Sequence, residues 1–402
     1  MNKLYERDSY LREAETVVTK SFSNDSGNYI CLEDAIFFPE EGGQHADTGT
    51  IEYEGGVVRV LAGEITGNST CSGGGSDTQE ITYKVSTLIP EGTRVKCILD
   101  WQARYDRMQN HSGEHLLTGM INKKYGFDNV GFHLSDDSPV TLDMNGMLTY
   151  EQVIEIEAMV NGLIYKNLPI TDSYPTKEEL KNIAYRSKID IDGQVRLITI
   201  GNADDTADVC ACCAPHVRTT GEIGILKVIS VIKWKSGVQI AMLCGRRALE
   251  YINSEHDIIR ETTGILSTNM VNIPGSVTSL IEETKQLKLR LAQVSENSVA
   301  DSIMNAGDNA PKCVFVDGDF PAVAMKNIYN LLVEKNTGYC GIFAGNDAEG
   351  YRYYAGGSGL DARELAGLMR AGLSAKGGGS AEMIQGKTEA DRESIEKFFE
   401  EL

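Results

Sequence analysis

The stretch DWQARYDRMQNHSGEHLLTGMINKKYG spans residues 100–126 and holds the most informative spacing in the chain. It begins with an aspartate, a preferred helix N-cap, and ends with a glycine that closes helices. A helix is therefore predicted over 101–125. His111 and His115 lie four residues apart, so both imidazoles project from one face of that helix. This geometry suits two ligands of one metal ion, and the alternative is an ordinary surface or core pair of histidines.

A second pair of candidate ligands follows about a hundred residues later, where residues 210–216 read CACCAPH. Cys212 and His216 are again four residues apart, and a thiolate with an imidazole can complete a tetrahedral zinc site. Such borderline and soft ligands favour zinc over magnesium or calcium. Cys212 is the preferred thiolate because of this spacing, while Cys210 and Cys213 remain alternatives.

Composition restricts the class of protein. The chain has 402 residues, too many for one compact core, and nine cysteines. Its N-terminus lacks a secretory apolar core, and the sequence lacks an apolar stretch of about 18 residues. We therefore expect a cytoplasmic protein without membrane spans, in which a disulfide framework is disfavoured. The net charge of −20 repels phosphate, so any RNA contact must come from local basic or backbone-amide patches.

Patterns along the chain predict an α+β multidomain protein. The predicted domains are a small β-rich, glycine-motif domain (1–100), an α+β zinc-binding domain (101–245), a helical linker (246–300) and a C-terminal α/β domain (301–402). The individual elements expected are strands at 57–61 and 94–99, a helix opening at Thr149, a hairpin over 223–243 turning at Ser236-Gly237, a helix at 322–335, and helices from Asp361 and from Thr388.

The helical linker carries apolar or small residues at alternating steps of three and four. These are Val277, Leu280, Thr284, Leu287, Leu291 and Val294. This seam is shorter than the three to four heptads that usually identify a coiled coil. It either pairs between two subunits or folds against its neighbours. A homodimer through the linker or the C-terminal domain is therefore one hypothesis.

The segment His111 to His115 also fits the inverted zinc-peptidase pattern H-x-x-E-H, in which Glu114 would activate water. This peptidase hypothesis leaves Cys212 and His216 without a role. A third hypothesis is a non-catalytic RNA-binding or dimerisation module whose zinc is structural.

Three stretches together resemble the alanyl-tRNA editing proteins of the AlaX type and the editing domain of alanyl-tRNA synthetase. They are FFPEEGGQHADTG at 37–49, RYDRMQNHSGEHLL at 104–117 and CCAPHVRTTGEIG at 212–224. A fourth, GGGSAEMIQG at 377–386, resembles the glycine-rich C-terminal domain of that synthetase. The resemblance covers about residues 27–402 and leaves no room for an aminoacylation domain ahead of it, so a free-standing editor is expected.

The resemblance implies zinc-dependent hydrolysis of mischarged tRNA(Ala), with Ser-tRNA(Ala) preferred and Gly-tRNA(Ala) second. It implies that His111, His115, Cys212 and His216 hold the zinc. Two motifs depart from the usual pattern, because Gly-Gly-Gly-Gln is Glu-Gly-Gly-Gln at 41–44 and Cys-Gly-Gly-Thr-His is Cys-Cys-Ala-Pro-His at 212–216. The proline removes a hydroxyl and a backbone donor, which affects substrate discrimination more than zinc binding.

Further residues are candidates for the site. Expected in catalysis or substrate binding are Gln44, Gly42, Gly43, Asp47, Glu114 and His133. For Glu114 the alternative is an inert surface carboxylate, and for His133 a buried structural histidine. Expected at the RNA are Arg104, Arg107, Gly377, Gly378 and Gly379, because arginines bind phosphate and glycine amides form anion nests. The alternatives are an acid-paired helix face for the arginines and a plain tight turn for the glycines.

Overall fold

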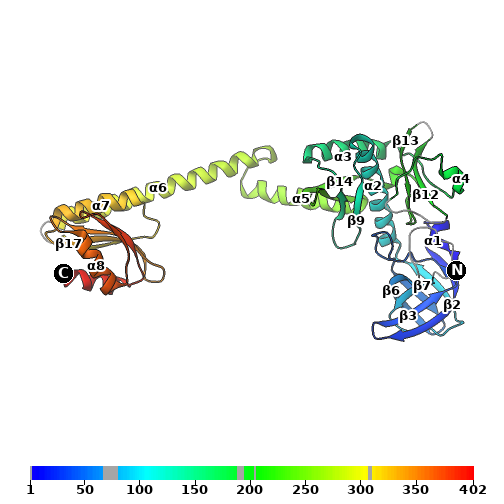
Figure 1. Cartoon of the computed structure of the whole chain (residues 1–402), viewed down its shortest axis with the longest axis horizontal. Helices are drawn as coiled ribbons and strands as arrows, with labels where there is room; N and C mark the ends of the chain where they lie inside the picture. The colour runs from blue at the N-terminus through cyan, green and yellow to red at the C-terminus, as the bar shows by residue number, and fades with distance from the viewer. Residues whose placement is uncertain (1, 67–79, 188–193, 203–204, 307–309) are drawn as a thin grey trace. The chain divides into compact units, whose positions relative to one another are not determined.

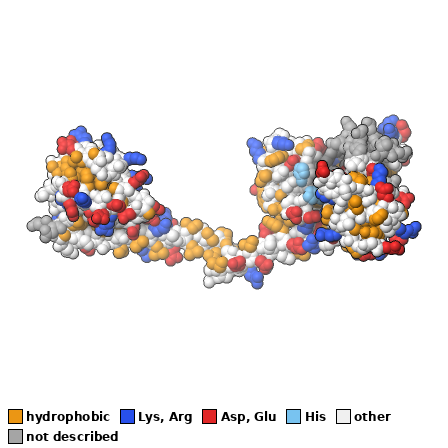
Figure 2. Space-filling model, turned by 90° about the horizontal axis from the view of Figure 1, so that it is seen from below, with side chains coloured by type: hydrophobic (Ala, Val, Ile, Leu, Met, Phe, Trp, Pro, Cys, Tyr) orange, Lys and Arg blue, Asp and Glu red, His pale blue; other side chains and the backbone are white. Residues whose placement is uncertain are grey.

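The computed structural model describes residues 2–66, 80–187, 194–202, 205–306 and 310–402 (Figure 1). The chain divides into an N-terminal unit, Met1–Ile258, and a C-terminal unit, Ile259–Leu402. Acidic and basic side chains are interspersed on the face of each unit seen in Figure 2. The described part of the chain contains no helix long and apolar enough to span a membrane.

The N-terminal unit begins with a closed antiparallel β-barrel. Its order is β2 (Glu13–Asn24), β3 (Gly27–Leu32), β7 (Glu80–Val85), β6 (Gly56–Thr66), β5 (Gly49–Tyr53) and β8 (Arg94–Leu99). Alternate residues point inward, so Ile51 on β5 is buried between Val58 and Cys97 of its two neighbouring strands. The short elements β1 (Asn2–Lys3), α1 (Leu4–Arg7) and β4 (Asp34–Ala35) lie outside this ring.

Helix α2 (Trp101–Tyr125) is the central element of the same unit. Its bounds agree with the prediction, because Asp100 accepts a hydrogen bond from the backbone amide of Ala103 and Gly126 ends the helix with φ +71°. Nearly the whole of 104–121 is buried, which is unusual for a helix with so many polar residues. The polar residues of α2 must therefore find partners inside the protein.

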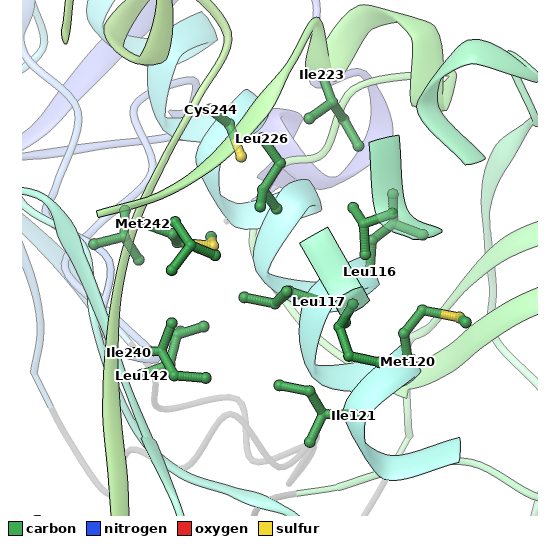
Figure 3. Packing of buried hydrophobic residues seen from close by; sticks show 14 of the residues in the cluster. Leu116, Leu117, Met120, Ile121, Leu142, Ile223, Leu226, Ile240, Met242 and Cys244 are labelled. Carbon is green, nitrogen blue, oxygen red and sulfur yellow. The ribbon is translucent and has the colours of Figure 1, made fainter. Parts of the chain in front are cut away.

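An antiparallel sheet covers one side of α2. Its order is β14 (Leu226–Trp234), β15 (Gly237–Cys244), β10 (Val140–Met144) and β9 (Asn129–His133). Leu117 and Ile121 of α2 pack into a buried cluster with Leu142 and Ile240 of the sheet (Figure 3). The predicted hairpin is confirmed, but its turn lies one residue earlier than predicted, at 235 and 236, because Trp234 pairs with Gly237.

The remaining elements of this unit were partly predicted. The helix expected at Thr149 is α3 (Tyr150–Tyr165), which opens with a capping box. A small sheet of β11 (Ile170–Ser173), β12 (Leu197–Asn202) and β13 (Asp205–Ala211) was not predicted. Helix α4 (Lys177–Leu180) and the single turn η1 (Thr220–Ile223) complete the set.

The helical linker consists of α5 (Gly245–Ile265), which runs across the division between the units, the turn η2 (Met270–Asn272) and α6 (Ile273–Ala306). The C-terminal sheet has the order β16 (Cys313–Val316), β17 (Tyr339–Asn346), β18 (Gly350–Gly357), β20 (Ile384–Thr388) and β19 (Lys376–Gly379). Its helices are α7 (Ala322–Lys335), α8 (Ala362–Leu373) and α9 (Arg392–Glu400).

One predicted boundary in the C-terminal unit is wrong. Thr388 does not open a helix, because it ends β20 and pairs with Tyr351 of β18. The last helix begins at Arg392, after Asp391 has accepted a hydrogen bond from the backbone amide of Ser394. With that correction, the mixed α+β multidomain class is confirmed.

Candidate metal centre

The two pairs of candidate ligands meet in the N-terminal unit. His111 and His115 come from α2, while Cys212 and His216 come from the loop that follows β13. One ligand atom from each of the four lies within 4.8 Å of the others. The Cys212 Sγ atom is 3.6 Å from His111 Nε2 and 3.4 Å from His216 Nε2. Three imidazoles and one thiolate form a ligand set typical of zinc.

Hydrogen bonds turn two of the imidazoles toward the thiol. His111 Nδ1 lies 2.7 Å from Gln44 Oε1, and His216 Nδ1 lies 2.9 Å from Ser112 Oγ. Because an amide oxygen only accepts, Nδ1 of His111 carries a proton in this contact, and Nε2 is the ring nitrogen that faces the thiol. Such partners fix the tautomer and the direction of metal-binding histidines.

The third imidazole faces a carboxylate. His115 Nδ1 lies 3.6 Å from Asp208 Oδ2, and Arg186 holds Asp208 with two hydrogen bonds of 2.7 Å. Arg186 also donates to the backbone oxygen of His115 at 3.3 Å. Asp208 can approach α2 because Gly119 has no side chain, since a Cβ there would lie 2.9 Å from the carboxylate. His115, Asp208 and Cys210 form a second group of potential ligands within the same 4.8 Å limit.

The electrostatics favour the ligand forms of Cys212 and His216. Burial alone would raise the pKa of the Cys212 thiol, but the neighbouring charges, that of His111 above all, hold this pKa well below its usual value. Burial lowers the pKa of His216 to about 3, which keeps the imidazole neutral. A thiolate and a neutral imidazole are the forms that bind metal ions.

The glycine motif forms a tight turn above the cluster. Glu41 and Gln44 pair as an antiparallel bridge, and Gly42 and Gly43 between them have φ of +63° and +83°. These are left-handed values that glycine adopts without strain. A Cβ at Gly43 would overlap the carbonyl of Phe132, so the close approach of the turn to β9 also requires glycine. The turn thereby carries the Gln44 side chain to His111.

A cavity of about 640 Å³ opens beside the cluster. Its lining includes three of the four candidate ligands, His111, His115 and Cys212. The Phe132 ring forms another part of the wall and packs on the His111 imidazole with 4.8 Å between centroids. A volume of this size suits a small organic ligand or the end of a larger one.

The structure contradicts the prediction that Arg104 and Arg107 contact RNA. Arg104 is fully buried, where it bonds to Asp47 and donates to the backbone oxygen of Ile36 at 2.9 Å. Arg107 is 3% exposed and binds Asp47 at 3.3 Å and Asp136 at 2.5 Å. Asp47 is buried between these arginines and also accepts from the Phe38 amide, so it is not a substrate ligand. The acid-paired interpretation was the correct one, although the pairs are internal.

Two other side chains also differ from expectation. His133 is exposed and does not line the cavity, because residues alternate on β9 and Phe132 takes the inward position. Both interpretations of His133, as pocket residue and as buried structural histidine, are therefore wrong. Glu114 is not a surface carboxylate, since it is 2% exposed and lines the cavity. It accepts hydrogen bonds from Asn129 and Thr118, and its Oε2 is 3.7 Å from His115 Nε2.

The glycines at 377–379 lie in a strand rather than a tight turn. They belong to β19, which pairs antiparallel with β20 at one edge of the C-terminal sheet and is exposed throughout. Gly377 and Gly379 face backbone carbonyls so closely that a Cβ would overlap them, whereas Gly378 has open space beside it.

Sequence reasoning missed Asn129, Phe132, Arg186 and Asp208, which surround the cluster. Only the alternation of β9 gave a signal, and it did not say which face points inward. Taken together, the fold and the site define a class: a protein with a buried cluster of thiol and imidazole groups that could hold a metal ion, beside a ligand cavity.

Comparison with known proteins makes this class specific. Residues 195–239, which contain Cys212 and His216, match the family described as "Threonyl and Alanyl tRNA synthetase second additional domain". The alanyl-tRNA editing protein AlaX-L of Pyrococcus horikoshii is 28% identical over 98% of this chain and 96% of its own length. The alanyl-tRNA editing protein Aarsd1 of Bos taurus is 30% identical over 75% of this chain and 68% of its own length. The alanine–tRNA ligase of Archaeoglobus fulgidus is 28% identical over 98% of this chain, which spans only 43% of that ligase.

The chain belongs to the family of alanyl-tRNA editing proteins, a class of aminoacyl-tRNA deacylases. The peptidase hypothesis is not supported, because it left Cys212 and His216 idle and both join the cluster.

Proposed function

We propose that the chain removes the wrong amino acid from mischarged tRNA(Ala), most efficiently serine and secondarily glycine, as a free-standing factor without aminoacylation activity. The observation that carries this proposal is the cluster of His111, His115, Cys212 and His216 beside a cavity of about 640 Å³, in a chain of the editing family. Serine is preferred because a site that hydrogen-bonds a hydroxyl rejects an analogue without it strongly. A methyl-sized difference alone is worth only about 1–3 kcal/mol.

We further propose that the metal is zinc. The donor set fits, since Nδ1 of His111 and of His216 are already held by Gln44 and Ser112, which leaves both Nε2 atoms facing Cys212. When bound, a zinc ion polarises a carbonyl or lowers the pKa of water, and so supplies the Lewis acidity that ester hydrolysis needs.

The chain's own residues have separate roles in this proposal. Glu114 lines the cavity and is oriented by Asn129, so its carboxylate accepts the proton of the attacking water. Gln44 is fully buried and does not line the cavity, so it acts as a positioning residue for His111 rather than contacting substrate. Gly42 lines the cavity, where its missing side chain lets the substrate approach the turn.

Contact with the RNA is proposed at the C-terminal edge strand, since Arg104 and Arg107 are internal. The backbone amides of 377–379 lie on the exposed β19, flanked by the basic side chains of Lys376 and Lys387 in a shallow cavity. Replacing both lysines with alanine is expected to weaken binding of whole tRNA. It should leave deacylation of a short aminoacylated acceptor-stem fragment unchanged.

A second copy of the chain is proposed as the partner of α6. The apolar seam residues are exposed by the fractions 41% (Val277), 50% (Leu280), 56% (Leu287), 67% (Leu291) and 65% (Val294). Hydrophobic side chains, drawn in orange, are visible along the linker in Figure 2. Acidic residues at 282–283 precede basic ones at 288 and 290, so an antiparallel second copy brings opposite charges together. Leu287→Lys should make the protein monomeric in sedimentation, whereas Leu289→Lys, an exposed change off the seam, should not.

Deacylation of charged tRNA(Ala) tests the proposal. Zinc-loaded protein is incubated with seryl-, glycyl- and alanyl-tRNA(Ala), and Cys212→Ala and a chelated sample serve as controls. Release of serine with alanine spared supports editing. Zinc bound with no release from any substrate would favour the non-catalytic module, and peptide cleavage would revive the peptidase.

A further inference from the structure

One carboxylate at the cavity wall has an oxygen without a partner. Glu41 lines the cavity, and its Oε2 is buried without a hydrogen bond. Two other lining carboxylates differ: Glu114 accepts from the amide of Asn129, and Asp128 accepts from the amide of Asn122 at 2.8 Å. A buried charged oxygen without a donor is costly, so its presence needs a reason.

The turn itself does not need Glu41. The left-handed backbone conformations fall on Gly42 and Gly43, and Glu41 is not among the described residues with positive φ. Its bridge with Gln44 places both side chains on the same face, because directly opposed residues of an antiparallel pair share a face. Gln44 reaches His111 at 2.7 Å. The turn therefore places the Glu41 carboxylate beside the four candidate metal ligands.

No resident cation balances this carboxylate among the described residues that line the cavity. Arg186 is the cationic side chain there, and its Nε and Nη2 atoms donate to Asp208 at 2.7 Å. A ligand that carries a positive charge would therefore meet an unpaired carboxylate oxygen at Glu41.

We propose that Glu41 binds the α-ammonium group of the aminoacyl ester and so makes the enzyme specific for esters with a free amino group. This inference rests on the proposed function. In such an ester the ammonium nitrogen is two bonds from the carbonyl carbon, so one end of the group meets Glu41 while the carbonyl points toward the cluster. Ammonium–carboxylate hydrogen bonds are among the strongest that proteins make.

The experiment replaces the charge without changing the size of the substrate. Seryl-tRNA(Ala) is compared with its α-hydroxy analogue, in which a hydroxyl replaces the ammonium, at about pH 6.5, below the usual α-amino pKa of about 7.7–8.0. We expect kcat/KM of the wild type to be about 10- to 100-fold higher for the seryl ester, as for a charge-assisted hydrogen bond. In Glu41→Gln this ratio should fall close to the ratio of the uncatalysed hydrolysis rates of the two esters.

Glu40→Gln is the matched control, because Glu40 is the neighbouring glutamate but is exposed and does not line the cavity. It should keep the wild-type ratio. Metal content and melting temperature of both variants show whether the fold is intact. If Glu41→Gln does not fold, the wild-type ratio is compared with that of the uncatalysed reaction, and equal ratios would overturn the inference. A wild-type ratio equal to the uncatalysed one, or an equal loss on both substrates in Glu41→Gln, would overturn the inference while leaving deacylation established. Failure of the wild type to release serine at all would instead overturn the proposed function.

Discussion

Gly113 stands between the two helix ligands and should tolerate no side chain. A Cβ atom there would overlap the Sγ atom of Cys244 and lie 3.5 Å from Leu226 Cδ1, in the packed layer between α2 and the sheet (Figure 3). Overpacking of a rigid core costs about 1–3 kcal/mol, and a full overlap belongs at the upper end. The better helix propensity of alanine returns about 1 kcal/mol. Gly113→Ala should therefore lose about 2 kcal/mol of unfolding free energy.

The assay is urea unfolding followed by tryptophan fluorescence. Both tryptophans, Trp101 and Trp234, lie in the N-terminal unit, so this signal is blind to the C-terminal unit. The control is Gly162→Ala on α3, where an added Cβ meets nothing within 4 Å and stability should rise by up to about 1 kcal/mol. Because His111 and His115 flank Gly113, the displaced helix should also bind metal more weakly.

A double variant tests whether the overlap with Cys244 causes the loss of stability in Gly113→Ala. Cys244→Ala removes the sulfur that Gly113→Ala would strike, so the overlap cost disappears and the two changes together should cost about 3 kcal/mol less than the sum of the separate losses. Additive losses, or a Gly113→Ala protein as stable as the wild type, would refute the packing argument.

Three further predictions concern charges around the centre. Asp208→Asn should weaken metal affinity about 10- to 100-fold, because the carboxylate orients His115. Chelator competition at about pH 8 measures this loss. Burial lowers the pKa of His115, but the effects of Cys210 and Asp208 outweigh burial and raise this pKa well above its usual value. His115 must therefore lose a proton when a metal ion binds. Metal affinity measured by titration should therefore rise with pH from 6 to 8, by up to about tenfold per unit, and a flat profile would contradict this assignment. Asp47→Ala should cost about 3–5 kcal/mol in urea unfolding, because it leaves the buried Arg104 guanidinium without its carboxylate and removes one of the two carboxylates that bind Arg107. The half-exposed Asp136→Ala should cost about 1 kcal/mol or less.

The features predicted from sequence were those encoded by short spacings. Asp100 and Gly126 mark both ends of α2, and the four-residue steps His111–His115 and Cys212–His216 each lie within one local segment. Local geometry fixes such relationships before tertiary structure forms, so the helix and the two ligand pairs were accessible to sequence reasoning.

Long-range pairing was not accessible in the same way. Arg104 looked like an exposed phosphate ligand because its partner, Asp47, is 57 positions away, and only the fold brings them together. On β9 the alternation of residues was readable, but whether Phe132 or His133 faces the cavity depends on the turn at Gly43, which β9 contacts. Asp208 lies on β13, which pairs with β12, and the sequence pattern did not predict this strand pair.

The most direct test of the account is to restore activity to metal-stripped protein by titration with zinc. The account predicts that release of serine from Ser-tRNA(Ala) returns and saturates at one zinc per chain, and that Cys212→Ala neither binds this equivalent tightly nor recovers activity. Full activity without metal, or an active Cys212→Ala protein, would contradict the claim that the cluster of His111, His115, Cys212 and His216 is the deacylation centre.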